Sequence, residues 1–213
     1  IENILSFNDD VVFELDLTPN RGDCLSHLGV ARELGITADK AVKRRPVKEL
    51  KESGSAADDI KIHIDAQDGC PRYAARVIKG VKVGPSPKWL SERLHSIGLS
   101  SINNIVDAAN YVLMDSGHPM HTFDLKKIIG NTINIRFANT GEKLTTLDGI
   151  ARKLDNLHLL ICDNKKPIAL AGIMGGLNSA IAESSTDILL ESAYFNPTVV
   201  RKGAKMFDLS TEA

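Results

Sequence analysis

The stretch DILLESAYFNP, residues 187–197, carries the two patterns on which the fold class depends. Its first nine residues are mostly apolar and predict a β-strand. Asn196-Pro197 then predicts the start of a helix, because proline loses no hydrogen bond at the first helical position. A strand is therefore followed directly by a helix near the end of the chain.

The same patterns recur upstream without a regular strand-helix-strand rhythm. Strands are predicted at residues 11–17, 60–64, 73–80, 132–138, 157–163 and 167–176, with a hairpin that turns at Asp148-Gly149. Helices are predicted from Asp23 or Ser26 to about Ile36, from Pro87 to Gly98, and over 102–113. This order favours an α+β fold with mixed β-sheets and packed helices over a doubly wound fold.

Composition excludes several classes of protein. The chain has 213 residues, of which 43% are hydrophobic and 25% charged, as in a soluble globular protein. It contains no apolar run of the roughly 18 residues that a membrane span needs. Its three cysteines are odd in number and form no CxxC pair, which indicates reduced thiols in the cytoplasm rather than a disulfide scaffold or zinc ribbon.

Charge limits how the chain could bind nucleic acid. The net charge is -1, so any RNA contact must come from a local patch. The richest patch is Lys40, Lys43, Arg44, Arg45, Lys48 and Lys51. All of these residues except Lys40 lie in a segment, residues 41–59, that also contains Pro46 and ESGSAADD and resembles a solvated linker. We therefore predict a domain boundary there.

The glycine-rich stretch AGIMGG, residues 171–176, is the first candidate for a binding site. It lacks the GK[ST] ending of a phosphate loop and does not match GxGxxG. Gly172, Gly175 and Gly176 would let a ligand or a second backbone approach closely, or would simply form a turn.

Two kinds of titratable side chain are further candidates. His118 and His121 stand three apart, but no nearby Cys, Glu or third His completes a metal-ligand set, so no metal is expected. His121 would be structural or would orient a water molecule or a hydroxyl. Glu191 shares a strand face with Leu189 and Ala193, so it lies at an exposed sheet edge or lines a cleft. No serine or cysteine is placed as a covalent nucleophile.

Five stretches stand out when they are taken together: TPNRGDCLSHLGVARELG (18–35), INNIVDAANYVLMDSGHPMHTFDL (102–125), ALAGIMGG (169–176), LLESAYFNP (189–197) and LSTEA (209–213). In this order they resemble one family, the beta subunit of bacterial phenylalanyl-tRNA synthetase. The resemblance implies that residues 1–45 belong to a neighbouring N-terminal domain, that 46–59 form a linker, and that 60–213 form the editing domain.

The resemblance also implies an activity and its partners. The editing domain would hydrolyse tRNA(Phe) mischarged with tyrosine, while ATP and magnesium would serve aminoacylation elsewhere in the full cytoplasmic enzyme. No cofactor is implied for this fragment. The other partner would be the alpha subunit, in a heterotetramer of two alpha and two beta chains. The alternative is a non-catalytic, structural or tRNA-binding region with a degenerate pocket.

Site residues carry over position by position. His121 and Asn110 match the residues that hold the ester and its attacking water, and Glu191 matches the carboxylate that accepts the tyrosine phenol proton. Gly172 lies in the glycine stretch whose backbone amides would assist. Gly175 and Ala213 match small positions that leave room for the aromatic ring of the substrate, and Thr211 matches a threonine close to the pocket. Two departures, Ala109 in place of a threonine and Ser100-Ser101 in place of Arg-Pro, predict weaker substrate contacts rather than a different fold.

Overall fold

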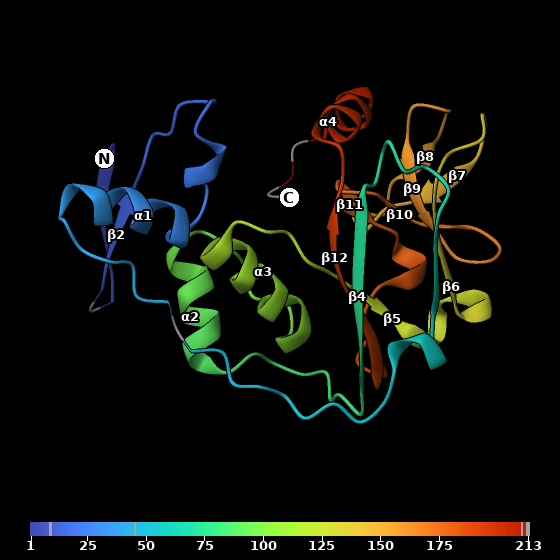
Figure 1. Ribbon diagram of the computed structural model, residues 1–213, viewed down its shortest axis with the longest axis horizontal. Coiled ribbons are helices and arrows are strands. Elements are labelled where there is room, and N and C mark those ends of the chain that lie inside the picture. The colour runs from blue at the N-terminus through green and yellow to red at the C-terminus, as the bar shows by residue number, and fades with distance from the viewer. Residues whose placement is uncertain (9, 45, 210, 212–213) are drawn as a thin grey trace. The chain divides into compact units, whose positions relative to one another are not determined.

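The computed structural model describes residues 1–213 except 9, 45, 210, 212 and 213 (Figure 1). Contacts divide the chain into two compact units. Unit 1 consists of Ile1–Lys51 and Gly84–His118, and unit 2 consists of Glu52–Val83 and Pro119–Ala213. The helices predicted within 84–118 therefore cluster with the N-terminal segment. The boundaries at 45/46 and 59/60, which come from the resemblance, stay predictions.

Unit 1 is a β-hairpin with three helices. Its elements are β1 (Asn3–Phe7), β2 (Asp10–Glu14), α1 (His27–Thr37), α2 (Lys88–Ser96) and α3 (Asn104–Ser116). Ser26 begins α1, because its hydroxyl accepts from the Gly29 amide at 3.0 Å. Pro87 is the N-cap of α2 rather than its first helical residue. Gly117 ends α3 in the left-handed conformation with φ of 81°.

Unit 2 is built on two main sheets (Figure 1). The five-stranded sheet has the order β11 (Met174–Gly175), β10 (Pro167–Leu170), β9 (Leu159–Cys162), β6 (Thr132–Phe137) and β3 (Lys61–Ile64). The three-stranded sheet has the order β4 (Arg72–Lys79), β12 (Asp187–Tyr194) and β5 (His121–Asp124). Because β3 and β6 are parallel and the other pairs antiparallel, the larger sheet is mixed.

Smaller elements complete the chain. Strands β7 (Lys143–Thr145) and β8 (Ala151–Lys153) form the hairpin predicted around Asp148-Gly149. Helix α4 (Pro197–Met206) begins at Asn196, whose side chain accepts from the Thr198 amide. Single 3-10 turns lie at Gly22–Cys24, Ala56–Asp58, Leu125–Lys127, Ile129–Asn131 and Leu177–Ser179.

The core of unit 2 lies on both faces of the larger sheet. On one face Ile133, Ile135 and Ile161 form a buried cluster with Phe123 and Leu189 of the smaller sheet. On the other face a separate cluster around Leu160 and Leu170 packs against α4 through Val200 and Ala204. The smaller sheet therefore turns one face, which includes Phe123 and Leu189, toward the core.

The predicted fold class is confirmed, with two strands missed. β1 and β5 were not predicted, and β5 carries His121. Glu191 does share a face with Leu189 and Ala193, as the period-two pattern required. No helix in the described part of the chain is long and apolar enough to cross a membrane.

Candidate functional site

His121 and Glu191 are brought together by strand pairing. β12 pairs antiparallel with β5, and the register sets Glu191 directly opposite His121 and Leu189 opposite Phe123. Directly opposed residues point to the same sheet face with Cβ atoms about 4.5–5.5 Å apart. Since Phe123 and Leu189 are fully buried in the core, His121 and Glu191 extend the same inward-facing row.

Glu191 is a carboxylate in an apolar setting. It is only 6% exposed, so the exposed-edge alternative is wrong. The Tyr73 hydroxyl of β4 donates a hydrogen bond to Glu191 Oε2 at 2.9 Å. Burial raises the pKa of Glu191 to about 7, although the hydrogen bond from Tyr73 acts in the opposite direction. A carboxylate with this pKa can exchange protons near neutral pH and gains from a further hydrogen-bond donor.

His121 is held as a neutral imidazole. Burial lowers the pKa of His121 to about 4, so the ring carries no charge at neutral pH. Its ring lies edge-on to Phe123 with centroids 4.6 Å apart. A neutral imidazole can both donate and accept a hydrogen bond, and that pair of roles can orient water.

Gly175 is where the larger sheet meets the His121 ring. A Cβ built on Gly175 would lie 2.5 Å from His121 Cε1 and 2.6 Å from Nε2. A methyl group cannot fit at that distance without moving the ring. The absence of a side chain at Gly175 therefore leaves room for the His121 ring. His121, Glu191 and Gly175 together form a wall that joins β5, β12 and β11.

The other glycines of AGIMGG have different neighbours. Gly172 adopts φ of +67°, and a Cβ there would lie 2.9 Å from Val200 Cγ2, beneath α4. The amides of Ala171, Ile173 and Gly176 donate to the backbone carbonyls of Leu159, Leu170 and Ile168. These three amides are therefore occupied by the fold and do not form a free cradle for an oxyanion.

The remaining predicted site residues come from other parts of the chain. Asn110 lies half-buried on α3 in unit 1, and its role stays a prediction from the resemblance. Thr211 is exposed beyond α4, and Ala213 lies outside the described residues. His118 is exposed and belongs to unit 1, whereas His121 belongs to unit 2.

Asp107 shows how a polar side chain of α3 is used structurally. Its carboxylate is completely buried and accepts hydrogen bonds from the hydroxyls of Ser86 and Ser101 and from the Ile102 amide. These bonds lower its pKa despite the opposing effect of burial. The carboxylate therefore anchors the segments that precede α2 and α3.

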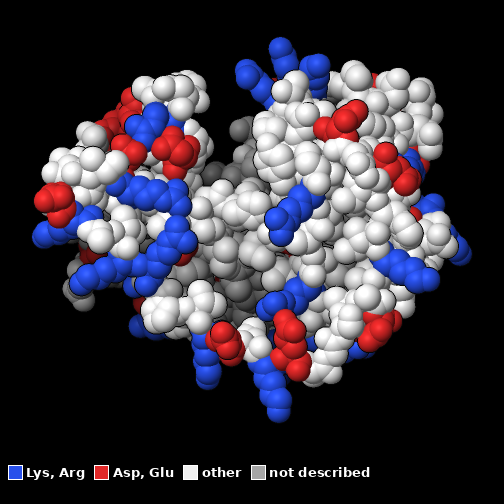
Figure 2. All heavy atoms as spheres, viewed as in Figure 1, with Lys and Arg blue, Asp and Glu red and all other residues white. Residues whose placement is uncertain are grey.

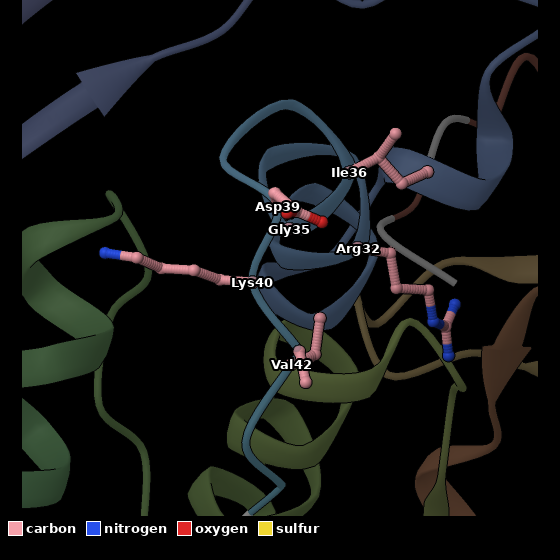
Figure 3. A pocket seen from close by; sticks show the side chains of 7 residues that line it. Arg32, Gly35, Ile36, Asp39, Lys40 and Val42 are labelled. Carbon is pink, nitrogen blue, oxygen red and sulfur yellow. The ribbon is translucent and has the colours of Figure 1, made fainter.

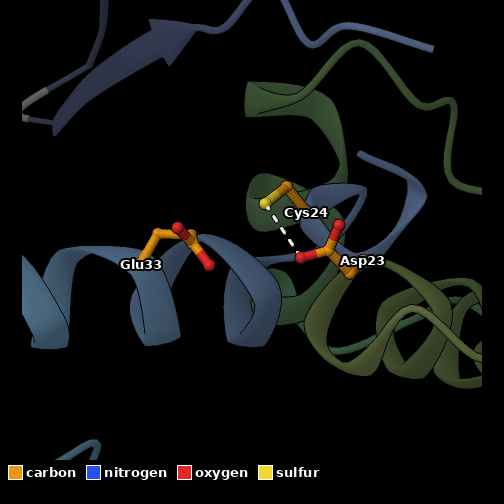
Figure 4. A group of neighbouring side chains, drawn as sticks. All are labelled: Asp23, Cys24 and Glu33. Carbon is orange, nitrogen blue, oxygen red and sulfur yellow. Dashed lines mark hydrogen bonds between the residues drawn. The ribbon is translucent and has the colours of Figure 1, made fainter. Parts of the chain in front are cut away.

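A second group of polar side chains lies in unit 1 (Figure 4). Asp23, Cys24 and Glu33 bring metal-ligand-type atoms within 4.8 Å of one another. The Arg21 guanidinium donates to Asp23, to Cys24 Sγ at 2.9 Å and to Glu33 at 2.8 Å. One arginine therefore accounts for the cluster as an ion-pair network at the start of α1.

A shallow hollow of about 380 Å³ lies at the end of α1 (Figure 3). Its lining residues are Arg32, Gly35, Ile36, Asp39, Lys40, Ala41 and Val42. The side chains of Arg32 and Lys40 point to opposite sides in Figure 3. Because binding sites need polar groups that converge on a ligand, the wall around His121 and Glu191 is the better candidate.

Comparisons with known proteins agree with the sequence motifs. A family model described as the B3/4 domain matches residues 69–213. The chain is 48% identical over 96% of its length to the "Phenylalanine--tRNA ligase beta subunit" of Anaeromyxobacter dehalogenans, and 48% identical over its whole length to that of Carboxydothermus hydrogenoformans. It covers 26% of each relative, so it spans about a quarter of their length.

A solved structure has a related fold. It is an N-terminal fragment of the phenylalanyl-tRNA synthetase beta subunit from Pyrococcus horikoshii, with a TM-score of 0.51 and 17% sequence identity. The match covers 96% of this chain and 63% of that one. At this identity the match supports the α+β architecture alone.

Proposed function

This chain belongs to the B3/4 domain family, and from that premise we propose that it contains the editing domain of a phenylalanine-tRNA ligase beta subunit, which hydrolyses mischarged tRNA. The reaction is hydrolysis of the ester that joins tyrosine to tRNA(Phe). The observation that carries the proposal is the inward-facing wall on which His121 lies directly opposite Glu191 and against Gly175.

The chemistry of Glu191 fits discrimination between two similar amino acids. An apolar pocket rejects an analogue with one added hydroxyl poorly, whereas a site built to hydrogen-bond that hydroxyl can reject the analogue lacking it by about 10⁴ to 10⁵. A buried carboxylate that gains from a further donor is suited to read the phenol of tyrosine. Phenylalanine offers no such donor and would leave the carboxylate less well satisfied.

The chemistry of His121 fits the ester end of the substrate. Water attacks the ester carbonyl, the carbon–oxygen bond to the ribose breaks, and the leaving ribose oxygen takes up a proton. With a pKa of about 4, His121 is a weak base at neutral pH, so its proposed role is to orient the attacking water. Hydrolysis of an activated ester depends largely on such orientation, and no catalytic triad is needed.

The proposed partners and cofactors rest on the family resemblance rather than on contacts within this chain. We propose that the complete protein pairs with an alpha subunit, two copies of each, in the cytoplasm, and that ATP and magnesium bind outside the segment described here. The substrate is the acceptor end of tRNA(Phe) carrying tyrosine. The test of the proposal is a deacylation assay with Tyr-tRNA(Phe) on the intact two-subunit enzyme, in which absence of deacylation would refute it.

His121→Ala is expected to slow deacylation of Tyr-tRNA(Phe) by roughly 10- to 100-fold, since the attacking water loses its orientation. The preference for tyrosine over phenylalanine should persist, because Glu191 is untouched. Single-turnover deacylation of both aminoacyl-tRNAs measures this, with the exposed His63 replaced by alanine as the control. A reversed amino-acid preference in His121→Ala would contradict the placement of His121 at the ester.

Helix α4 supplies a cationic surface for the tRNA. Arg201, Lys202 and Lys205 are exposed, and within the described residues none of them has an ion-pair partner. Figure 2 shows blue side chains projecting where Figure 1 draws α4. Cations placed in this way can neutralise phosphates of a bound RNA.

Replacing Arg201, Lys202 and Lys205 together by alanine is expected to raise the KM for Tyr-tRNA(Phe) and leave kcat unchanged. The slope of log binding constant against log salt should fall by about two to three. The matched control replaces Lys143, Lys153 and Lys165 by alanine, since these are also exposed and carry the same charge. Equal effects of the two triple variants would show that only net charge matters and that α4 is not a specific contact.

A further inference from the structure

Tyr73 is the side chain through which the fold holds Glu191. The two residues are 118 positions apart in the chain and lie on adjacent strands. Ala75 is directly opposite Glu191, and Tyr73 is directly opposite Ala193, so Tyr73 reaches Glu191 diagonally. Diagonal neighbours are within reach of a long aromatic side chain. The Tyr73 hydroxyl is 2.9 Å from Glu191 Oε2.

The hydrogen bond uses one side of the carboxylate. A carboxylate has two oxygens and about four acceptor positions. Among the described residues Tyr73 is the side-chain donor that reaches Glu191, and it contacts Oε2. Oε1 keeps its acceptor positions for another donor.

We propose that Tyr73 is a specificity-determining positioning residue, which occupies Oε2 of Glu191 so that Oε1 is presented to the phenol of the substrate. This inference rests on the editing function proposed above. Tyr73 does not contact the reacting ester. It acts through Glu191, by fixing the direction of the carboxylate and by stabilising its charged form.

Among the described titratable groups around Glu191, only Glu191 itself changes charge near neutral pH. Tyr73 faces it from β4, His121 from β5, and the Cys70 thiol from the turn before β4. Burial and Glu191 raise the pKa of Cys70 to about 11, and burial raises the pKa of Tyr73 well above its usual value. His121 loses its proton at about pH 4. In the neutral range these three groups are therefore uncharged, and none offsets a negative charge on Glu191.

Removal of the Tyr73 hydroxyl should therefore favour the protonated form of Glu191. The hydrogen bond lowers the pKa of Glu191 against the effect of burial, so its loss raises that pKa above about 7. A larger fraction of Glu191 is then a neutral acid at pH 7, which is a poorer acceptor for a phenol. At a pH above the raised pKa, the carboxylate is ionised again and accepts as before.

The experiment compares Tyr73→Phe with the unchanged two-subunit enzyme. Single-turnover deacylation of Tyr-tRNA(Phe) and Phe-tRNA(Phe) is followed from about pH 5.5 to about pH 9, with spontaneous ester hydrolysis subtracted. At pH 7 the ratio of the deacylation rates of Tyr-tRNA(Phe) and Phe-tRNA(Phe) should be about tenfold lower in the variant. The midpoint of the pH profile of this ratio should move to higher pH. At the highest pH most of the preference should return.

Two controls separate this inference from a folding defect. Tyr194→Phe removes the same hydroxyl from an exposed tyrosine of β12 and should leave the pH profile unchanged. Formation of Phe-tRNA(Phe) by the Tyr73→Phe enzyme should be normal, because aminoacylation is carried out elsewhere. A variant of Tyr73 that merely loosened the sheet would lower activity equally at every pH.

The outcomes distinguish the two proposals. An unchanged midpoint and unchanged preference in Tyr73→Phe, while Glu191→Gln lowers discrimination, would overturn the role of Tyr73 and leave the editing function standing. Failure of the unchanged enzyme to deacylate Tyr-tRNA(Phe) would overturn both. An upward shift of the midpoint with recovery at high pH supports the inference.

Discussion

Replacing Glu191 by alanine in the two-subunit enzyme is expected to let Tyr-tRNA(Phe) accumulate while Phe-tRNA(Phe) still forms. The variant removes the proposed acceptor of the substrate phenol. A hydrogen bond to a charged group is worth about 1.5–3 kcal/mol, which corresponds to roughly 10- to 150-fold in the rate of tyrosine deacylation. The measurement is the steady-state level of each aminoacyl-tRNA, together with single-turnover deacylation.

The alanine variant also leaves the Tyr73 hydroxyl without its acceptor. This loss can destabilise the smaller sheet by about 1–3 kcal/mol, so a milder variant is needed beside it. Glu191→Gln keeps the size of the side chain and a carbonyl acceptor but removes the charge. Its rate of Tyr-tRNA(Phe) deacylation should lie between those of the unchanged enzyme and Glu191→Ala. Exposed Glu183 replaced by alanine is the control for loss of a carboxylate. Unaffected deacylation in Glu191→Ala would show that the carboxylate does not read the phenol.

Gly175→Ala is expected to reduce deacylation of Tyr-tRNA(Phe) by about 100-fold, since a displacement of about 1 Å at a reacting centre can cost that much. The added methyl would lie 2.5 Å from His121 Cε1, so the ring must move. Gly175 does not have a positive φ, and alanine therefore adds bulk without backbone strain. Gly54→Ala, where a Cβ would meet no atom within 4 Å, is the matched control.

A double variant shows whether the methyl acts through the histidine. If Gly175→Ala works by displacing the ring, then adding it to His121→Ala should cause little further loss, because the ring is already absent. Residues in contact are expected to show such non-additivity. Fully additive losses would mean that the methyl blocks substrate directly, as the resemblance alone had predicted for a position that leaves room for the aromatic ring.

Local patterns in the sequence predicted many of the elements but not the strand that carries the histidine. The stretch HTFD is short, follows Pro119, and has no alternation long enough to indicate a strand. It becomes β5 because β12 offers it an antiparallel partner about 65 residues further along the chain. For the same reason Tyr73 could not be assigned to the site, although its strand was predicted.

Within unit 2 the fold brings together only some of the predicted site residues. Glu191, His121 and Gly175 meet, whereas Gly172 lies under α4. The role of a glycine is ambiguous in a sequence. The sequence shows that a side chain is absent there, but it does not identify the residues that pack against the glycine. The neighbours of Gly172 and Gly175 come from α4 and β5, which are distant along the chain.

By itself the sequence determined the α+β class, the shared face of Glu191, Leu189 and Ala193 on β12, and the beginning of α4 at Asn196. These features depend on residues one to four positions apart, whose periodicity and capping are local. The tertiary structure alone decided that Glu191 faces His121, that Tyr73 binds its Oε2, and that Gly175 supports the imidazole. Each of those contacts joins distant strands, and their register is set by burial of the shared core rather than by any local preference.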